Sequence, residues 1–209
     1  MTGTQIKVFV GLVFVATAVV LVVQGHPPSK DYWRPFSTVV TIVAFALLLW
    51  ERYLWSWPVL RLLGKRPNIR GTWKGILQSN WEDPQTKERH KPVEVYLIVR
   101  QTYSTLDVRL FSAESSSISL SANLSADSAG IYTLAVTYLN TPNALKLEGS
   151  PISHGGMLLN LRGDGSVQQL DGKYWTDRKT LGEVTLPLRV QRICHHLNDA
   201  SQAFSAKTA

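Results

Sequence analysis

The residues best suited to binding chemistry stand at every second position of one short stretch, YWTDRKT, residues 174–180. Alternate side chains of an extended strand share one face, so Tyr174, Thr176, Arg178 and Thr180 are expected to point the same way. Arg178 is the first choice for an anionic oxygen group such as a phosphate, because a guanidinium can donate two parallel hydrogen bonds. The neighbouring ring and hydroxyl groups complete a plausible binding face.

Two further pairs combine a ring plane with an amide edge. Asn80 and Trp81 stand at the end of the first strand expected below, and Tyr138 and Asn140 stand at the end of the fifth. Aromatic rings stack on flat ligand rings, and amides can both donate and accept hydrogen bonds. These four residues are therefore candidates for the rim of a ligand site.

Each candidate has a structural alternative. Tyr138 and Tyr174 could simply fill the interior of the fold, and Arg178 could be a surface charge paired with Asp177 or Glu183. The sequence alone leaves these alternatives open.

No converging set of catalytic or metal-binding residues is found, so we expect no enzyme activity and no metal. The single cysteine, Cys194, precedes His195 and His196, but neighbouring residues on a strand point to opposite faces. No second cluster would complete a tetrahedral site.

Hydrophobic residues recur with a period of two from Gly71 onward, which is typical of strands. Turn-forming residues separate the segments. The expected strands are Gly71–Asn80, Val93–Gln101, Leu106–Phe111, Ser117–Leu124, Ile131–Leu139, Gly156–Leu161, Gln169–Trp175 and Gly182–Val190.

Consecutive strands with short connections predict an all-β, eight-stranded up-and-down barrel over residues 71–194, since closure removes exposed sheet edges. A barrel of this size either fills itself or holds one small ligand. On the fifth strand we expect Leu134, Val136 and Tyr138 to face inward. The start Gly71-Thr72-Trp73 is similar to that of lipocalin-like barrels, in which the tryptophan plugs one end. Residues 195–209 are expected to form a disordered tail.

The first 57 residues have a different composition. Segments 6–23 and 36–55 are strongly apolar, and we expect two transmembrane helices that form a hairpin. A cleaved signal peptide ending near Ala16-Thr17-Ala18 is the alternative, although the apolar run continues through Val23, past that position.

The net charge of +7 is concentrated beside the second apolar segment. From Gly71 to the end there are 14 Lys and Arg against 13 Asp and Glu, whereas the linker 58–70 holds four basic residues and no acidic one. Such a cluster favours a location beside the cytoplasmic face of a membrane. We therefore expect a multi-pass protein of the bacterial inner membrane with a cytoplasmic barrel, and no binding of duplex nucleic acid.

Four sequence stretches resemble one known family. They are NIRGTWKGILQSNW (68–81), YLNTP (138–142), HGGMLLNL (154–161) and DGKYWTDRKTLGEV (171–184), and they follow the two apolar segments. The whole arrangement resembles the CD-NTase-associated transmembrane β-barrel effectors of bacterial CBASS antiphage defence.

The resemblance implies a ligand and a set of partners. Members bind a cyclic dinucleotide made by a partner CD-NTase, and binding drives homo-oligomerisation of the membrane helices, disruption of the inner membrane and abortive infection. Membrane lipids are implied as a further partner, and no cofactor is expected. Under this hypothesis the ligand contacts are Asn80, Trp81, Tyr138, Asn140, Tyr174, Thr176, Arg178 and Thr180.

Two other classes of protein fit the same pattern of elements. A membrane-anchored, lipocalin-like carrier of an apolar ligand would have a pocket lined by Leu, Val and Tyr alone. A structural tether would have a filled barrel without a cavity large enough for a dinucleotide.

Overall fold

The computed structural model describes residues 7, 10, 11, 13–15, 18, 19, 41, 43–57, 66–82, 86–144, 150–163 and 167–208. The chain divides into two compact units. One consists of Met1–Arg66 with Thr102–Thr105, and the other of Pro67–Gln101 with Leu106–Ala209.

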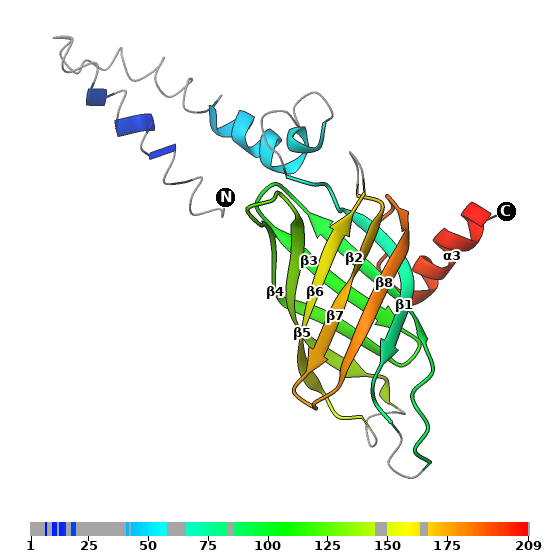
Figure 1. Ribbon diagram of the computed structural model, residues 1–209. Coiled ribbons are helices and arrows are strands. Elements are labelled where there is room, and N and C mark those ends of the chain that lie inside the picture. The colour runs from blue at the N-terminus through cyan, green and yellow to red at the C-terminus, as the bar shows by residue number, and fades with distance from the viewer. Residues whose placement is uncertain are drawn as a thin grey trace. The chain divides into compact units, whose positions relative to one another are not determined.

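The second unit is a closed barrel of antiparallel strands in the order β1 to β8, as Figure 1 shows. The strands are β1 (Gly71–Ser79), β2 (Val93–Gln101), β3 (Leu106–Ser112), β4 (Ser115–Ala126), β5 (Tyr132–Pro142), β6 (Ser153–Arg162), β7 (Gln169–Thr176) and β8 (Leu181–Val190). The predicted eight-stranded barrel is therefore confirmed. Several predicted ends lie one to three residues from the observed ones, since turn-forming residues still pair at strand ends.

The barrel closes where β1 pairs with β8, from Thr72 opposite Val190 to Ser79 opposite Gly182. The register shifts between Lys74 and Ile76. A Cβ on the intervening Gly75 would lie 1.9 Å from the backbone oxygen of Thr185, so only glycine lets the two strands approach this closely.

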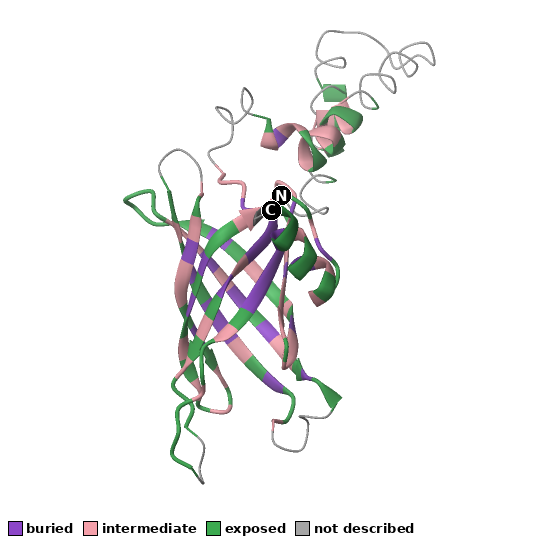
Figure 2. Ribbon diagram, turned by 90° about the vertical axis from the view of Figure 1, so that its right-hand side faces the viewer, coloured by how far each residue is buried: buried purple, intermediate pink, exposed green. Residues whose placement is uncertain are grey.

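Inward-facing residues follow the expected period of two. Leu134, Val136 and Tyr138 on β5 are buried, whereas Thr133 and Thr137 are partly or fully exposed. Figure 2 shows buried and exposed residues alternating along the strands. The inner apolar cluster draws on every strand of the barrel.

Trp73 closes one end of the interior, as expected for a lipocalin-like barrel. Its ring is fully buried, and its Nε1 donates a hydrogen bond to the backbone oxygen of Ile69 at 2.9 Å. The Arg189 guanidinium lies 5.0 Å from the centre of the Trp73 ring, a favourable cation–π arrangement. Burial lowers the pKa of Arg189. The interior is therefore packed around Trp73 and can be open only elsewhere.

The C-terminal segment differs from expectation, because residues predicted to be a disordered tail form the helix α3 (Leu197–Thr208). Ala200 and Phe204 on this helix pack against Tyr96 and Ile98, which face outward from β2. Cys194 belongs to the same buried cluster. The helix is stable because it covers an apolar strip of the barrel wall, a tertiary contact that the local sequence does not reveal.

The first unit corrects the predicted membrane segments. Only residues 7, 10, 11, 13–15, 18, 19, 41 and 43–55 of the predicted spans 6–23 and 36–55 are described, and 58–65 of the basic linker lie outside the described residues. Residues 43–52 are helical.

Among the described residues, no helix is both long and apolar enough to cross a membrane. The predicted transmembrane hairpin is therefore unsupported. The expected location, a multi-pass protein of the inner membrane with a cytoplasmic barrel, is wrong on this finding.

Candidate ligand-binding site at the barrel mouth

A cavity of about 520 Å³ opens at the end of the barrel where the connections β1–β2, β3–β4, β5–β6 and β7–β8 meet. The up-and-down order of the strands places these four connections together, on the end opposite to the start of β1. This volume lies in the range of about 300–1,000 Å³ that is usual for small-molecule sites. The alternative of a filled barrel without a cavity is therefore wrong.

The structure brings together seven of the eight predicted site residues. The residues that line the cavity are Trp81, Tyr138, Asn140, Tyr174, Thr176, Arg178 and Thr180. Asn80 does not line it: its Oδ1 accepts a hydrogen bond from the backbone N–H of Leu181 at 2.8 Å. Asn80 therefore ties the end of β1 to the start of β8.

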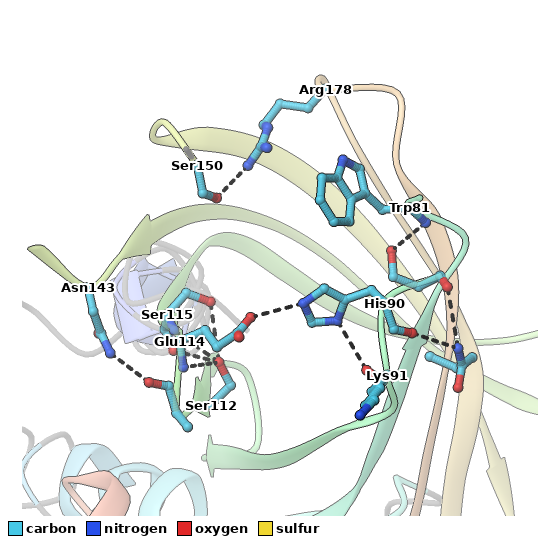
Figure 3. A network of polar contacts seen from close by, with 12 residues as sticks. Trp81, His90, Lys91, Ser112, Glu114, Ser115, Asn143, Ser150 and Arg178 are labelled. Carbon is cyan, nitrogen blue, oxygen red and sulfur yellow. Dashed lines mark hydrogen bonds and ion pairs between the residues drawn. The ribbon is translucent and has the colours of Figure 1, made fainter. Parts of the chain in front are cut away.

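Arg178 stands at the rim on the β7–β8 turn. Its Nη1 donates a hydrogen bond to Ser150 Oγ at 2.6 Å, on the connection before β6 (Figure 3). Asp177, one of its two predicted alternative partners, instead accepts a hydrogen bond from the His154 backbone N–H at 2.9 Å. The guanidinium is therefore kept among the residues that line the cavity.

Two tyrosines form part of the inner wall. The Tyr138 hydroxyl donates a hydrogen bond to the Trp175 backbone oxygen at 3.3 Å. The Tyr138 ring packs against Gly155, where an added Cβ would lie only 2.4 Å from it. Burial raises the pKa of Tyr138, and burial also raises the pKa of Tyr174. Both hydroxyls therefore stay protonated at neutral pH and can donate hydrogen bonds.

His90 and Glu114 were missed by sequence reasoning. His90 Nε2 lies 3.4 Å from Glu114 Oε2, and the rings of His90 and Trp81 form a T-shaped pair with their centres 5.9 Å apart (Figure 3). His90 comes from the β1–β2 connection and Glu114 from the β3–β4 turn. Neither residue stood in a periodic pattern, so the sequence carried no signal for their meeting.

Six of the eight hydroxyl side chains in the lining, all of them serines, were also missed, whereas Thr176 and Thr180 were predicted. The serines and threonines that line the cavity are Ser79, Ser112, Ser115, Ser117, Ser150, Ser153, Thr176 and Thr180. Ser117 Oγ donates a hydrogen bond to Asn140 Oδ1 at 2.9 Å, which orients that amide. Ser115 and Ser117 alternate on β4, so the serine-rich stretch 115–121 held a usable period-two signal.

The lining is polar enough to argue against a carrier of apolar ligands. Twelve of the 20 lining residues are polar or charged and three are aromatic, which leaves five aliphatic side chains. An apolar ligand would have to strip water from many hydroxyls without replacing their hydrogen bonds, which is unfavourable. A ligand with both rings and anionic oxygens matches this lining better.

The adjacent Cys194, His195 and His196 do not form a site. Cys194 is buried beneath α3, whereas His195 Nδ1 lies 2.9 Å from Arg100 Nη2 on the outer surface. Among the described residues, no group of three or more potential ligands could hold a metal ion.

Comparison with known proteins points to one family. A family model described as "Cap15, cyclic dinucleotide receptor domain" matches residues 64–187. The CD-NTase-associated protein 15 of Staphylococcus schleiferi is 30% identical over 150 residues, which cover 72% of this chain and 76% of the relative. The match to the family model includes β1 to β7, part of β8, and every connection at the mouth of the barrel.

Proposed function

The chain belongs to the Cap15 family of cyclic dinucleotide receptors, and on this premise we propose that it binds a cyclic dinucleotide in the cavity at the barrel mouth. The family was identified correctly from the sequence. The single observation that supports the site most strongly is that seven of the eight residues predicted from the sequence line one cavity.

The chemistry of the lining suits the two kinds of group in such a ligand. Phosphate oxygens accept hydrogen bonds, and Arg178 together with the eight hydroxyls supplies donors for them. Bases present flat faces and polar edges, for which Trp81, Tyr138 and Asn140 offer rings and an amide. The apolar floor below the rim excludes water and thereby strengthens these polar contacts.

The proposed role is that of an effector in CBASS antiphage defence, with the ligand supplied by a CD-NTase. The name of the Staphylococcus schleiferi relative supports this association. No step in the proposal requires the chain to catalyse a reaction. Contact with membrane lipids and disruption of the inner membrane stay predictions that rest on the family resemblance.

We further propose that the ligand promotes self-association, since an effector must exist in two states that the ligand distinguishes. A ligand can shift such an equilibrium only by its difference in affinity for the two states. Light scattering of the full chain with and without saturating ligand tests this step. An unchanged molar mass would contradict self-association and leave the binding proposal intact.

Titration calorimetry of the full chain against a panel of cyclic dinucleotides tests the binding proposal. The matching linear dinucleotides are the control, because they carry the same bases but not the closed ring. We expect at least one cyclic ligand to bind more tightly than its linear counterpart. Absence of binding by every cyclic ligand would overturn the proposal.

A further inference from the structure

Glu114 places a negative charge at a site proposed to receive a dianion. It supplies the only carboxylate among the described residues that line the cavity. Its backbone is held on both sides: the N–H donates to Ser112 Oγ at 3.1 Å, and the C=O accepts from the Asn143 N–H at 2.9 Å. The position of this carboxylate is therefore built into the β3–β4 turn.

Any ligand group that reaches this carboxylate must suit its negative charge. Contact with either phosphate would bring like charges together in a partly water-excluded site, where repulsion is stronger than in bulk water. The bases are the remaining partners, because their edges carry N–H groups. Glu114 is thus fitted to a base and not to the sugar-phosphate ring.

The type of base follows from the donors that a carboxylate requires. An ionised carboxylate only accepts hydrogen bonds, and two parallel donors give it the strongest planar pairing. Guanine offers two adjacent donors, N1–H and the exocyclic amine. Adenine and cytosine each set one amine beside an acceptor, and uracil sets one N–H between two acceptors.

We infer that Glu114 accepts hydrogen bonds from N1–H and the exocyclic amine of a guanine, so that the receptor selects a cyclic dinucleotide containing at least one guanine. This inference rests on the proposed function. It adds the identity of one base and the residue that reads it.

His90 positions the carboxylate for this contact. Its Nε2 lies against Oε2 of Glu114 at 3.4 Å, and its ring and that of Trp81 form a T-shaped pair (Figure 3). A carboxylate has about four acceptor positions on its two oxygens, so a contact with His90 is compatible with a base on the same group. A base whose edge faces Glu114 would lie near Trp81, which also lines the cavity.

The order of strands separates this contact from the phosphate contact. The β3–β4 turn with Glu114 and the β7–β8 turn with Arg178 are four strands apart in a ring of eight, on opposite sides of the mouth. The two halves of a ligand would therefore meet different groups. One guanine, on the Glu114 side, satisfies the site.

The test compares ligands that differ by one amine. Cyclic GMP–AMP and cyclic IMP–AMP with the same linkages differ only in the exocyclic amine of guanine, and cyclic di-AMP lacks guanine altogether. Calorimetry of the full chain is carried out on the wild type, Glu114→Gln and the control Glu183→Gln, whose carboxylate is exposed on β8. Thermal melting checks that each variant is folded.

We expect the wild type and Glu183→Gln to prefer cyclic GMP–AMP over cyclic IMP–AMP by about tenfold to a hundredfold, the discrimination usual for a bidentate base contact. Glu114→Gln should lose most of this preference by losing affinity for the guanine ligand. Equal binding of the two ligands by the wild type, or equal weakening of both in Glu114→Gln, would overturn the inference alone. If the wild type bound none of these three ligands and no other cyclic dinucleotide of the panel, the proposed function would be overturned together with the inference.

Discussion

Arg178 and Ser150 join two neighbouring connections at the mouth of the barrel by a hydrogen bond of 2.6 Å from Nη1 to Oγ. The residues are 28 positions apart in the sequence, and the barrel topology brings them together. The contact keeps the guanidinium at the cavity. Because this contact uses Nη1, the other guanidinium nitrogens of Arg178 are the candidate donors to a ligand.

Arg178→Ala should weaken binding of the cyclic dinucleotide by about tenfold to a hundredfold, because a charge-assisted hydrogen bond to a phosphate contributes about 1.5–3 kcal/mol. Arg178→Lys should restore part of the affinity, since it keeps the charge but loses the paired donors. Calorimetry of the full chain measures both effects.

The control for Arg178 is Arg162→Ala, at the far end of β6. Arg162 is largely exposed and pairs with Asp171 at 2.5 Å on the outer surface, so its loss should leave affinity unchanged. If Arg178→Ala bound the ligand as tightly as Arg162→Ala does, Arg178 would be removed from the site.

Trp81→Ala should weaken ligand binding by about five- to a hundredfold, the loss expected when one base loses an aromatic stacking partner worth about 1–3 kcal/mol. Trp81→Phe should retain most of the affinity because a smaller ring still stacks. Trp175→Ala is the matched control, since the Trp175 ring lies over Gly156 and is 42% exposed. Equal effects of the two alanine variants would contradict stacking on Trp81.

The sequence predicts the barrel wall well because a strand imposes one simple period on its residues. That period correctly places Leu134 and Tyr138 inside, and it carries Tyr174, Thr176 and Arg178 to one face of the cavity. Side-chain direction along a strand alternates from one residue to the next, so the local sequence is enough to predict which residues face inward.

The missed features depend on residues far apart in the chain. His90 and Glu114 lie in connections without a period, and they meet only because closure of the barrel gathers alternate connections at one end. The helix α3 has few apolar residues of its own. Its partners, Tyr96 and Ile98, are about a hundred positions earlier, beyond the reach of any local pattern.

Phe204→Ala should lower the free energy of unfolding by about 3 kcal/mol, at the lower end of values for removing a buried phenylalanine, because the helix lies at the surface. Phe204 is only 6% exposed, and its ring centre is 5.9 Å from that of Tyr96. Urea denaturation measures the change, with the exposed position Ser201→Ala as control.

The affinity for the ligand should not change in Phe204→Ala, because α3 packs on the outer face of β2 whereas the cavity lies inside the barrel. A loss of affinity without a loss of stability would contradict a purely structural role for α3.

Stability should fall at alkaline pH through the buried tyrosines. Burial, aided by the nearby Tyr174 and Asp177 charges, raises the pKa of Tyr138 in the folded chain above its ordinary value near 10. As the pH rises past about 10, the unfolded chain loses this proton while the folded chain keeps it, so the folded state loses stability until the pH reaches the higher folded pKa. Each such proton costs up to about 1.4 kcal/mol per pH unit.

Tyr138→Phe removes this titration and should therefore flatten the decline in stability above about pH 10. It should also lower stability at neutral pH by about 1 kcal/mol, because the hydrogen bond to the Trp175 backbone oxygen is lost. Urea denaturation at about pH 8 and about pH 11 gives both quantities, since these values bracket the ordinary tyrosine pKa. If the stability of Tyr138→Phe declined as steeply as that of the wild type, another group would govern alkaline unfolding. The same comparison with Tyr174→Phe shows whether the second tyrosine of the cavity is that group.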